Sequence, residues 1–312
     1  MSTAPRNPPA PLTLIDKLRA LLRFSRPHTV IATTCQVVGV FIIAAAAADS
    51  AAGWPAILLW TWLGSQAANL YVVGLNQIID VPIDRLNKPA LPLASGELTR
   101  QAAVWLVVGA GLAALLIGAA QSVYLLLTLS AVMALGTVYS LPPWRLKGRP
   151  VWAAVSIALA RGIIANLGLY LHYRHTLFGS PVSAAPPPVW ALPFFFGFGL
   201  VIALFKDIPD HDGDGQFGVR TLAVRWGRRR VFQLGRALLT ALYLAALVAA
   251  VVWPASAGGL LVPAHLVALF VFLVAGAATD PDSPPSMMRL YLLLWVLFYA
   301  EYGFLALHAL TA

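Results

Sequence analysis

The chain is 312 residues long, 60% hydrophobic and only 11% charged, with a mean hydropathy of +0.79 and a formal net charge of +9. A soluble globular domain carries about 25% charged residues, so this composition excludes the soluble class and predicts an all-α polytopic membrane protein. In that class the positive charge is expected in loops that face the cytosol, and no nucleic-acid partner is needed to explain it. The single Cys35 excludes a disulfide framework and a cysteine-rich metal site.

Residues 1–27 are predicted to form a cytosolic tail and an interfacial segment. The first fifteen residues are rich in proline and lack the apolar core and small-residue cleavage site of a signal peptide. Residues 28–312 are predicted to form a single membrane domain, because a span needs about 20 largely apolar residues and nine such runs follow one another. The runs are 28–47, 56–78, 102–118, 122–141, 151–171, 188–205, 231–253, 258–276 and 288–310.

The distribution of Lys and Arg predicts the orientation of these nine spans. With the N-terminus inside, nineteen of the 21 Lys and Arg residues fall in or beside the segments assigned to the cytoplasm. Arg161 within the fifth span and Arg174 after it are the two exceptions. The protein is therefore expected to be a multi-pass protein with a cytosolic N-terminus.

Two acidic stretches follow the second and the sixth span, both on the predicted cytosolic side. Residues four apart lie on one face of a helix, and positions i, i+3 and i+7 share a face in the same way. The first stretch contributes Asn76, Asp80 and Asp84. The second contributes Asp207, Asp210 and Asp214. Two clusters of oxygen ligands suit Mg²⁺, which usually shares its shell with substrate phosphates; the alternative is a pair of solvated loops with helix-capping and turn aspartates.

Basic residues near both stretches fit a phosphate ligand, although each could also be an ordinary cytosolic loop charge. These residues are Arg85, Arg145, Lys147 and Lys206. A pocket at the membrane with two Mg²⁺ ions and a cationic rim suggests a lipid diphosphate whose chain lies among the helices. Metal ions and cationic side chains would then neutralise the departing diphosphate.

These motifs resemble those of the UbiA-type intramembrane prenyltransferases. The pattern N-x-x-x-D-x-x-x-D is matched by Asn76, Asp80 and Asp84, and D-x-x-x-D is matched by Asp210 and Asp214. Three further strings are similar to the homogentisate branch of that family, namely SRPHT at 25–29, NKPALPLASG at 87–96 and FKDIPD at 205–210.

The resemblance implies nine helices around a central cavity capped by cytosolic loops, in a bacterial inner or photosynthetic membrane. It implies Mg²⁺-dependent transfer of a prenyl group from a prenyl diphosphate to homogentisate. The acceptor loses its carboxylate as CO₂, which gives a tocopherol-type or plastoquinone-type precursor.

The same resemblance implies the roles of the site residues. Catalysis is assigned to Asp80, Asp84, Asp210 and Asp214. One of two diphosphate-bridged Mg²⁺ ions is assigned to Asn76, Asp80 and Asp84, and the other to Asp210 and Asp214 with support from Asp207. Arg145 and Lys147 match the basic loop that family members use against the diphosphate.

A few residues leave alternatives open. Pro82 lies inside the first stripe and lacks an N–H, so a kink or a new turn is expected between Asp80 and Asp84. Arg161 could anchor the carboxylate of the acceptor or pair with Glu301, and His28 could contact the acceptor or be an interfacial histidine. His172 is expected near the outer interface.

Two other functions remain open at this point. One is the same chemistry on another aromatic acid or on a chlorophyllide. The other is a cation-coupled transporter whose midplane carboxylates bind the ion, although the acidic stripes lie at span ends beside cations. The sequence leaves the prenyl chain length and the oligomeric state undecided.

Overall fold

The computed structural model describes residues 13–46, 53–179, 191–216, 221–252 and 259–311, except for the side chain of Asp214. All regular secondary structure in these ranges is helical. The long helices are α2 (Pro27–Ala45), α3 (Trp54–Asn87), α5 (Arg100–Gln121), α6 (Val123–Ser140), the row α7 (Pro150–Ala158), η2 (Leu159–Ile164) and α8 (Ala165–Phe178), α9 (Ala191–Lys206), α12 (Arg228–Val252), α13 (Leu261–Ala277) and α14 (Pro284–Thr311). The short ones are α1 (Leu14–Phe24), α4 (Pro92–Ser95), η1 (Leu146–Gly148), α10 (His211–Gln216) and α11 (Leu222–Trp226).

Each of the nine predicted spans falls on one of the long helices or helical rows. Within the described ranges, six of these are long and apolar enough to cross a membrane, and α9 and α13 are shorter apolar helices. Helix α3 has 34 residues and carries the polar residues Ser65, Gln66 and Asn69. The all-α membrane fold is therefore confirmed, while the number nine stays a prediction.

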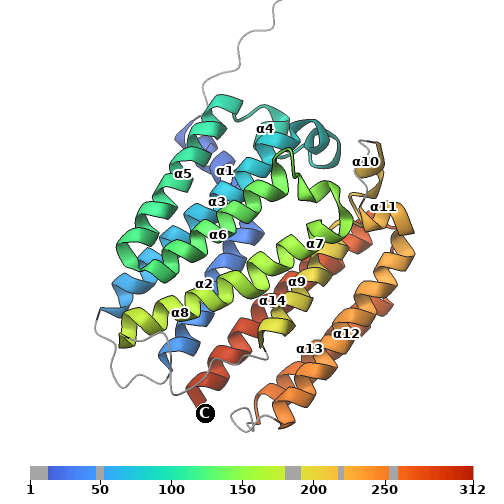
Figure 1. The fold of residues 1–312 in the computed structure, drawn as a ribbon. Helices are drawn as coiled ribbons and strands as arrows, with labels where there is room; N and C mark the ends of the chain where they lie inside the picture. The colour runs from blue at the N-terminus through green and yellow to red at the C-terminus, as the bar shows by residue number, and fades with distance from the viewer. Residues whose placement is uncertain (1–12, 47–52, 180–190, 217–220, 253–258, 312) are drawn as a thin grey trace, which may run out of the picture.

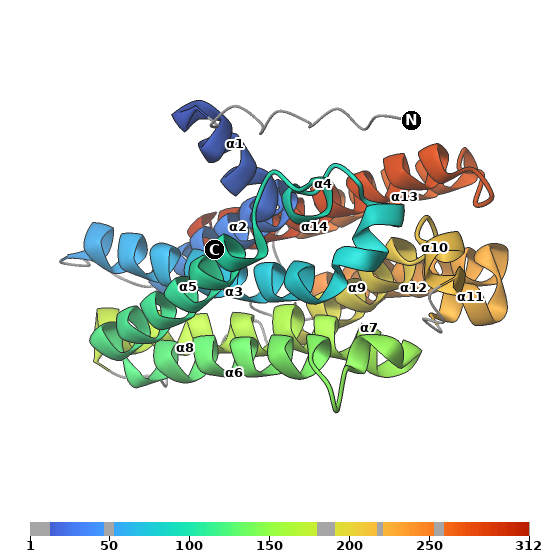
Figure 2. The same ribbon diagram turned by 90° about the horizontal axis from the view of Figure 1, so that it is seen from above.

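The long helices pack side by side and close into a ring. Neighbours in sequence are also neighbours in space: α3 packs on α5, α5 on α6, α12 on α13, and α13 on α14. The ring closes because α9 packs on both η2 and α12, while α14 returns to α2 (Figure 1). Seen from above, α3 lies between α2 and α6 (Figure 2). This central position explains why α3 carries polar residues that a lipid-facing helix would not tolerate.

Local sequence explains where several helices begin. The hydroxyl of Thr99 accepts a hydrogen bond from Ala102 N at the start of α5, and the hydroxyl of Ser122 accepts one from Leu125 N at the start of α6. Both satisfy one of the backbone donors that a helix start leaves free. Helices α2, α3 and α7 instead begin with proline in the first turn, where its missing N–H costs nothing.

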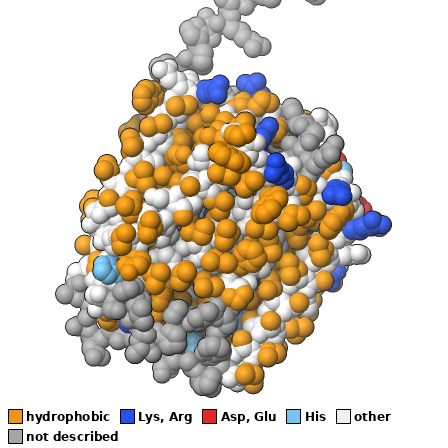
Figure 3. All heavy atoms as spheres, in the orientation of Figure 1, with side chains coloured by type: hydrophobic (Ala, Val, Ile, Leu, Met, Phe, Trp, Pro, Cys, Tyr) orange, Lys and Arg blue, Asp and Glu red, His pale blue; other side chains and the backbone are white. Residues whose placement is uncertain are grey.

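On the face of the molecule that Figure 3 shows, one end of the bundle is basic and the rest is mainly apolar. Figure 3 shows Lys and Arg side chains gathered at the end that carries α4, α10 and α11, whereas hydrophobic side chains cover most of the remaining described surface. Large apolar side chains on the outward faces of the helices are exposed, for example Trp105, Leu116 and Phe270. A water-soluble protein would bury such groups, so this surface is suited to contact with lipid acyl chains.

Helix α3 continues through Pro82 and ends only at Asn87. The start of a new turn between Asp80 and Asp84, one of the two expected outcomes, is therefore not observed. The helix carries both carboxylates into the protein interior, where their residues are 9% and 5% exposed. Pro82 itself is exposed, so its ring does not separate the two acidic side chains.

Candidate active site

A cavity of about 170 Å³ lies where the C-terminal ends of α3 and α9 meet the loop between α6 and α7. Its wall is built from segments that are far apart in sequence and combines carboxylates, amides and cations. The lining residues are Arg26, Asn76, Asp80, Ile83, Asp84, Asn87, Lys88, Tyr139, Arg145, Lys147, Gly148, Ala153, Lys206, Asp207, Asp210 and Thr221. Both acidic stretches therefore face one cavity, although more than 120 residues separate them.

The carboxylate of Asp80 lies at the centre of a polar cluster. Its Oδ1 is paired with Lys147 Nζ and lies 3.8 Å from Arg145 NH2, while its Oδ2 accepts a hydrogen bond of 2.9 Å from Asn76 Nδ2. Burial lowers the pKa of the Lys147 ammonium, and the nearby Asp80 carboxylate opposes this change. The loop between α6 and α7 thus places two cations directly on the first acidic stripe.

Asp84 lies one turn further along α3 and is not compensated in this way. It is buried, and its Oδ2 has no hydrogen-bond partner among the described residues. A buried carboxylate oxygen without a partner costs free energy on the order of several kcal/mol. An oxygen left free in a cavity of carboxylates and amides fits a hard cation such as Mg²⁺, which binds oxygen ligands.

The second acidic stretch is held against the first. Lys88, just after α3, donates to Asp210 Oδ2 at 2.5 Å, and Lys206 Nζ lies 3.4 Å from Asp207 Oδ1. Burial raises the pKa of the Asp207 carboxyl, against the influence of Lys206. At Gly213 the backbone comes so close to α3 that a Cβ atom would lie 1.6 Å from Asn87 Oδ1.

The described side chains alone do not form a compact metal cluster, since no group of three or more His, Cys, Asp or Glu residues gathers among them. The carboxylates lie in two sets on either side of the cavity, with lysines paired to Asp80 and Asp210. The predicted ligand Asp214 belongs to α10, and its side chain lies outside the described residues. Asp84 is the described group that fits a cation most directly.

Most of the predicted site residues meet in this cavity. The structure brings together Asn76, Asp80, Asp84, Arg145, Lys147, Lys206, Asp207 and Asp210. Arg85 is different, because its side chain is exposed and does not line the cavity. The prediction overlooked Arg26 and Lys88, although both stand in the branch-like strings SRPHT and NKPALPLASG.

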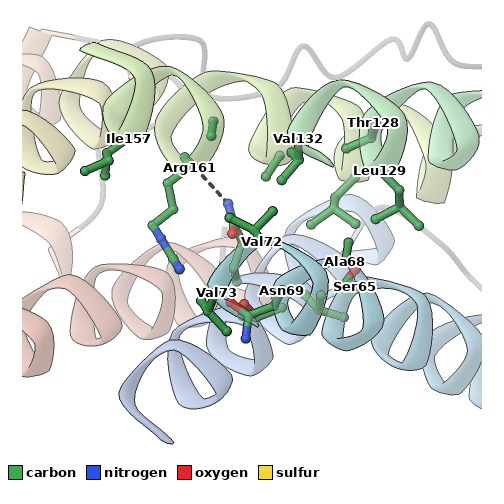
Figure 4. A pocket seen from close by; sticks show the side chains of 16 residues that line it. Ser65, Ala68, Asn69, Val72, Val73, Thr128, Leu129, Val132, Ile157 and Arg161 are labelled. Atoms are coloured by element: carbon green, nitrogen blue, oxygen red, sulfur yellow. Dashed lines mark hydrogen bonds between the residues drawn. The ribbon is translucent and has the colours of Figure 1, made fainter. Parts of the chain in front are cut away.

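A second cavity of about 190 Å³ lies beside the first along α3. Helix α3 lines the outer cavity with Asn76 and Asp80 and the inner one with Val72 and Val73, one turn earlier. Figure 4 shows the walls of the inner cavity, which are mainly apolar, with the Arg161 side chain extending from the helix that also carries Ile157. The fold therefore places a charged cavity, called the outer cavity, and a mainly apolar one, called the inner cavity, on successive turns of α3.

The structure decides one of the open questions about Arg161. Glu301 is hydrogen-bonded to the ring of His265 at 3.0 Å, so the alternative of an Arg161–Glu301 pair is wrong. The guanidinium of Arg161 instead lies over the indole of Trp295, 5.3 Å from the ring centroid. His28 contacts the same indole, with ring centroids 5.5 Å apart, and lines neither cavity.

His172 differs from the expectation of an interfacial residue. It is fully buried, and its two ring nitrogens lie 2.8 Å from the hydroxyls of Thr61 and Ser122. Three helical segments are joined by these two hydrogen bonds. The residue therefore has a structural role in packing α8 against α3 and the start of α6.

Comparison with known proteins agrees with this arrangement. Residues 37–300 match the model of the UbiA prenyltransferase family. The chain is 38% identical to the homogentisate phytyltransferase of Synechocystis over 91% of this chain and 94% of that protein. It is 36% identical to homogentisate phytyltransferase 1 of Arabidopsis thaliana over 92% of this chain and 74% of that protein.

A solved structure has the same fold. The UbiA homolog of Archaeoglobus fulgidus bound to DMAPP and Mg²⁺ superposes with a TM-score of 0.63 at 19% identity, over 94% of this chain and 99% of that one. At this identity the likeness concerns the fold. The family match covers most of the chain and the sequence relatives exceed 35% identity, so this protein belongs to the UbiA prenyltransferase family.

Proposed function

We propose that this protein transfers a prenyl group from a prenyl diphosphate to homogentisate, with loss of the acceptor's carboxylate. The observation that carries the proposal is the charged outer cavity, in which both acidic stretches and cations from the end of α3, α9 and the α6–α7 loop converge beside an apolar cavity. A diphosphate with a long apolar chain needs both environments at once. Two relatives named for homogentisate support this choice of acceptor.

The outer cavity would bind the diphosphate and divalent metal. Asn76, Asp80 and Asp84 would hold one Mg²⁺ ion, and Asp210 and Asp214, supported by Asp207, would hold a second. A bound Mg²⁺ neutralises charge that develops on the leaving diphosphate. The Archaeoglobus relative, solved with Mg²⁺ and a prenyl diphosphate, supports a divalent metal in this fold.

The cations of the cavity have a second task when a diphosphate is present. Lys147 and Lys88 are paired with Asp80 and Asp210 in the structure. A diphosphate competes for these ammonium groups, because its oxygens are strong acceptors and its charge is higher than that of one carboxylate. Arg145, Lys206 and Arg26 also line the cavity and would add positive charge beside the leaving group.

The overall reaction balances without an added oxidant. The bond between the prenyl C1 and the diphosphate oxygen breaks, and C1 forms a bond to a ring carbon of homogentisate. That ring carbon loses a proton, and the side-chain carbon that releases CO₂ takes one up. The apolar inner cavity would keep water away from the allylic carbon while its positive charge develops.

The experiment that tests the proposal is a turnover assay with the purified protein, Mg²⁺, homogentisate and a panel of prenyl diphosphates, with products identified by mass. The expected product has gained the prenyl group and lost the mass of CO₂. No product with homogentisate, or a product that keeps the carboxylate, would overturn the assignment. Asp80→Ala and Asp210→Ala should each abolish turnover in a protein that still purifies as a folded species.

The same panel separates the alternative acceptors. Prenylation of a 4-hydroxybenzoate-like acid or a chlorophyllide in place of homogentisate would keep the family chemistry and change the substrate. Ion-driven uptake into vesicles that is lost in Asp80→Ala would instead favour the transporter. The donor that gives the highest kcat/KM identifies the natural chain length.

A further inference from the structure

We propose that Arg161 and the inner cavity form the site for the acid group of the acceptor, with the Arg161 guanidinium binding its carboxylate. This inference rests on the proposed function and deepens it, because it names the residue that distinguishes an aromatic acid from a neutral phenol. It is carried by four features of the structure: an unpaired cation, its aromatic support, the backbone that positions it, and the polar groups around it.

Arg161 has no anionic partner among the residues that the structure describes. Glu301 is the acidic residue that the sequence offered as a partner for Arg161, but its carboxylate is hydrogen-bonded to His265. An arginine within a membrane bundle normally pairs with a carboxylate or faces a polar cavity.

The contact with Trp295 does not replace an anion. The guanidinium carbon lies 5.3 Å from the ring centroid, and such a cation–π contact contributes only weakly. Removing a cation from water costs more than this contact returns, even after the protein relaxes. Without a ligand, the contact with Trp295 therefore does not offset the desolvation of the Arg161 guanidinium. A bound carboxylate would offset it by accepting two hydrogen bonds from the guanidinium.

The backbone around Arg161 is built to hold this side chain in place. It lies in the π-helical segment η2, in which the N–H of Ala165 bonds to Ala160 O. Gln36 Nε2 donates to the Arg161 carbonyl at 2.9 Å and Asn166 Nδ2 donates to the Gly162 carbonyl at 3.0 Å, so the widened turn keeps its acceptors satisfied. Such π-bulges are frequent at functional sites.

The inner cavity also offers a polar group suited to a phenolic ring. Ser65 lines the cavity and is 7% exposed, and its Oγ has no hydrogen-bond partner among the described residues. In Figure 4, Ser65 and Arg161 come from opposite walls of the cavity. A ring that carries hydroxyl groups and an acid side chain, as homogentisate does, can use both groups, whereas a hydrocarbon chain can use neither.

The test compares two acceptors that differ in the carboxylate: homogentisate and methylhydroquinone, in which a methyl group replaces the acid side chain. Wild type should prefer homogentisate in kcat/KM. Arg161→Gln should lower kcat/KM for homogentisate by about 10–100-fold, the range expected for a hydrogen bond to a charged group. It should leave kcat/KM for methylhydroquinone and KM for the prenyl diphosphate within about twofold, so the preference disappears.

Arg174→Gln is the matched control. Arg174 is buried and also lies over an aromatic ring, 3.8 Å from the Phe178 centroid, but it does not line the inner cavity. Its loss should change stability and leave the acceptor preference intact. Arg161→Lys keeps the positive charge but loses the planar guanidinium that can donate two parallel hydrogen bonds. Its preference for homogentisate over methylhydroquinone should therefore be intermediate.

The outcomes separate this inference from the proposed function. If wild type prenylates homogentisate and Arg161→Gln keeps the wild-type preference, or if wild type shows no preference, the Arg161 site is overturned while the enzyme assignment stands. If wild type prenylates neither acceptor, the assignment fails. The unfolding midpoint measured with and without homogentisate then tests the Arg161 site. An increase in the wild-type midpoint that is lost in Arg161→Gln supports the site. An equal increase in both proteins, or no increase in wild type, overturns it.

Discussion

Lys88 Nζ lies 2.5 Å from Asp210 Oδ2 and ties the end of α3 to the segment that follows α9. The contact joins the two acidic stretches across the mouth of the outer cavity. It also leaves an ammonium group beside the place where a diphosphate would bind. In the proposed function, Lys88 would therefore both hold the two acidic stretches together and bind the diphosphate.

Lys88→Gln should raise the KM for the prenyl diphosphate about tenfold, because one hydrogen bond to a charged group contributes about 1.5 kcal/mol or more. Arg85→Gln is the matched control, three residues earlier on the same helix but exposed and outside the cavity. Steady-state kinetics with a fixed acceptor measure both. Equal KM values for the two variants would contradict the placement of Lys88 at the diphosphate.

Asp84→Asn should uncouple activity from stability. The amide keeps the shape of the side chain but removes the charge of a buried group whose Oδ2 has no partner. We expect the unfolding midpoint in metal-free detergent to stay equal or rise. Turnover should fall by at least about 100-fold, as when one charge-stabilising group is lost.

Two further measurements sharpen the test of Asp84. Mg²⁺ with a prenyl diphosphate should raise the unfolding midpoint of wild type and have a smaller effect on Asp84→Asn. Asp212→Asn serves as the control, since the Asp212 side chain is 71% exposed and pairs with Arg228 at the surface. Normal turnover in Asp84→Asn would remove this carboxylate from the proposed metal site.

The parts of the site that follow local periodicity were predictable from the sequence. Apolar runs and four-residue spacing depend on neighbours within one helix, and they identified the long helices and the stripe of Asn76, Asp80 and Asp84. The exposure of Arg85 follows from the same geometry. It is one residue after Asp84 and therefore points about 100° away from the stripe.

Other features depend on how distant helices pack, which no local pattern encodes. Lys88 reaches Asp210 across 122 residues, and Gln36 reaches the Arg161 carbonyl across 125. The burial of His172 depends on hydroxyls from two other helical segments. The sequence could not show which residue pairs with Glu301, because it does not show whether Arg161 or His265 lies beside Glu301 in the folded protein.

The orientation in the membrane is a separate prediction from the distribution of Lys and Arg. In a Cys35→Ala background, Arg229→Cys marks the basic end, where the Arg229 side chain is 75% exposed, and His175→Cys marks the opposite end. In intact cells a membrane-impermeant maleimide should label the cysteine at 175 and not the one at 229. Inside-out vesicles should give the reverse, and labelling at 229 in intact cells would show that the basic end faces outward.

The approach of η2 to α9 gives the last prediction. A Cβ atom at Gly162 would lie 2.5 Å from both Phe196 N and Phe196 Cα, and backbone atoms cannot rotate away as a side chain can. Gly162→Ala should therefore destabilise the protein by about 1–3 kcal/mol, the usual cost of overpacking. Because Arg161 is the preceding residue, the same shift should raise the KM for homogentisate.

Gly109→Ala is the control for the helical substitution itself. Gly109 lies within α5 on an exposed face, and its added Cβ would meet nothing within 4 Å. Replacing it should therefore stabilise the helix by about 0.5–1 kcal/mol through reduced backbone entropy of the unfolded chain. Reversible unfolding in mixed micelles measures both variants. Similar midpoints for Gly162→Ala and Gly109→Ala would mean that η2 and α9 do not pack as closely as the structure shows.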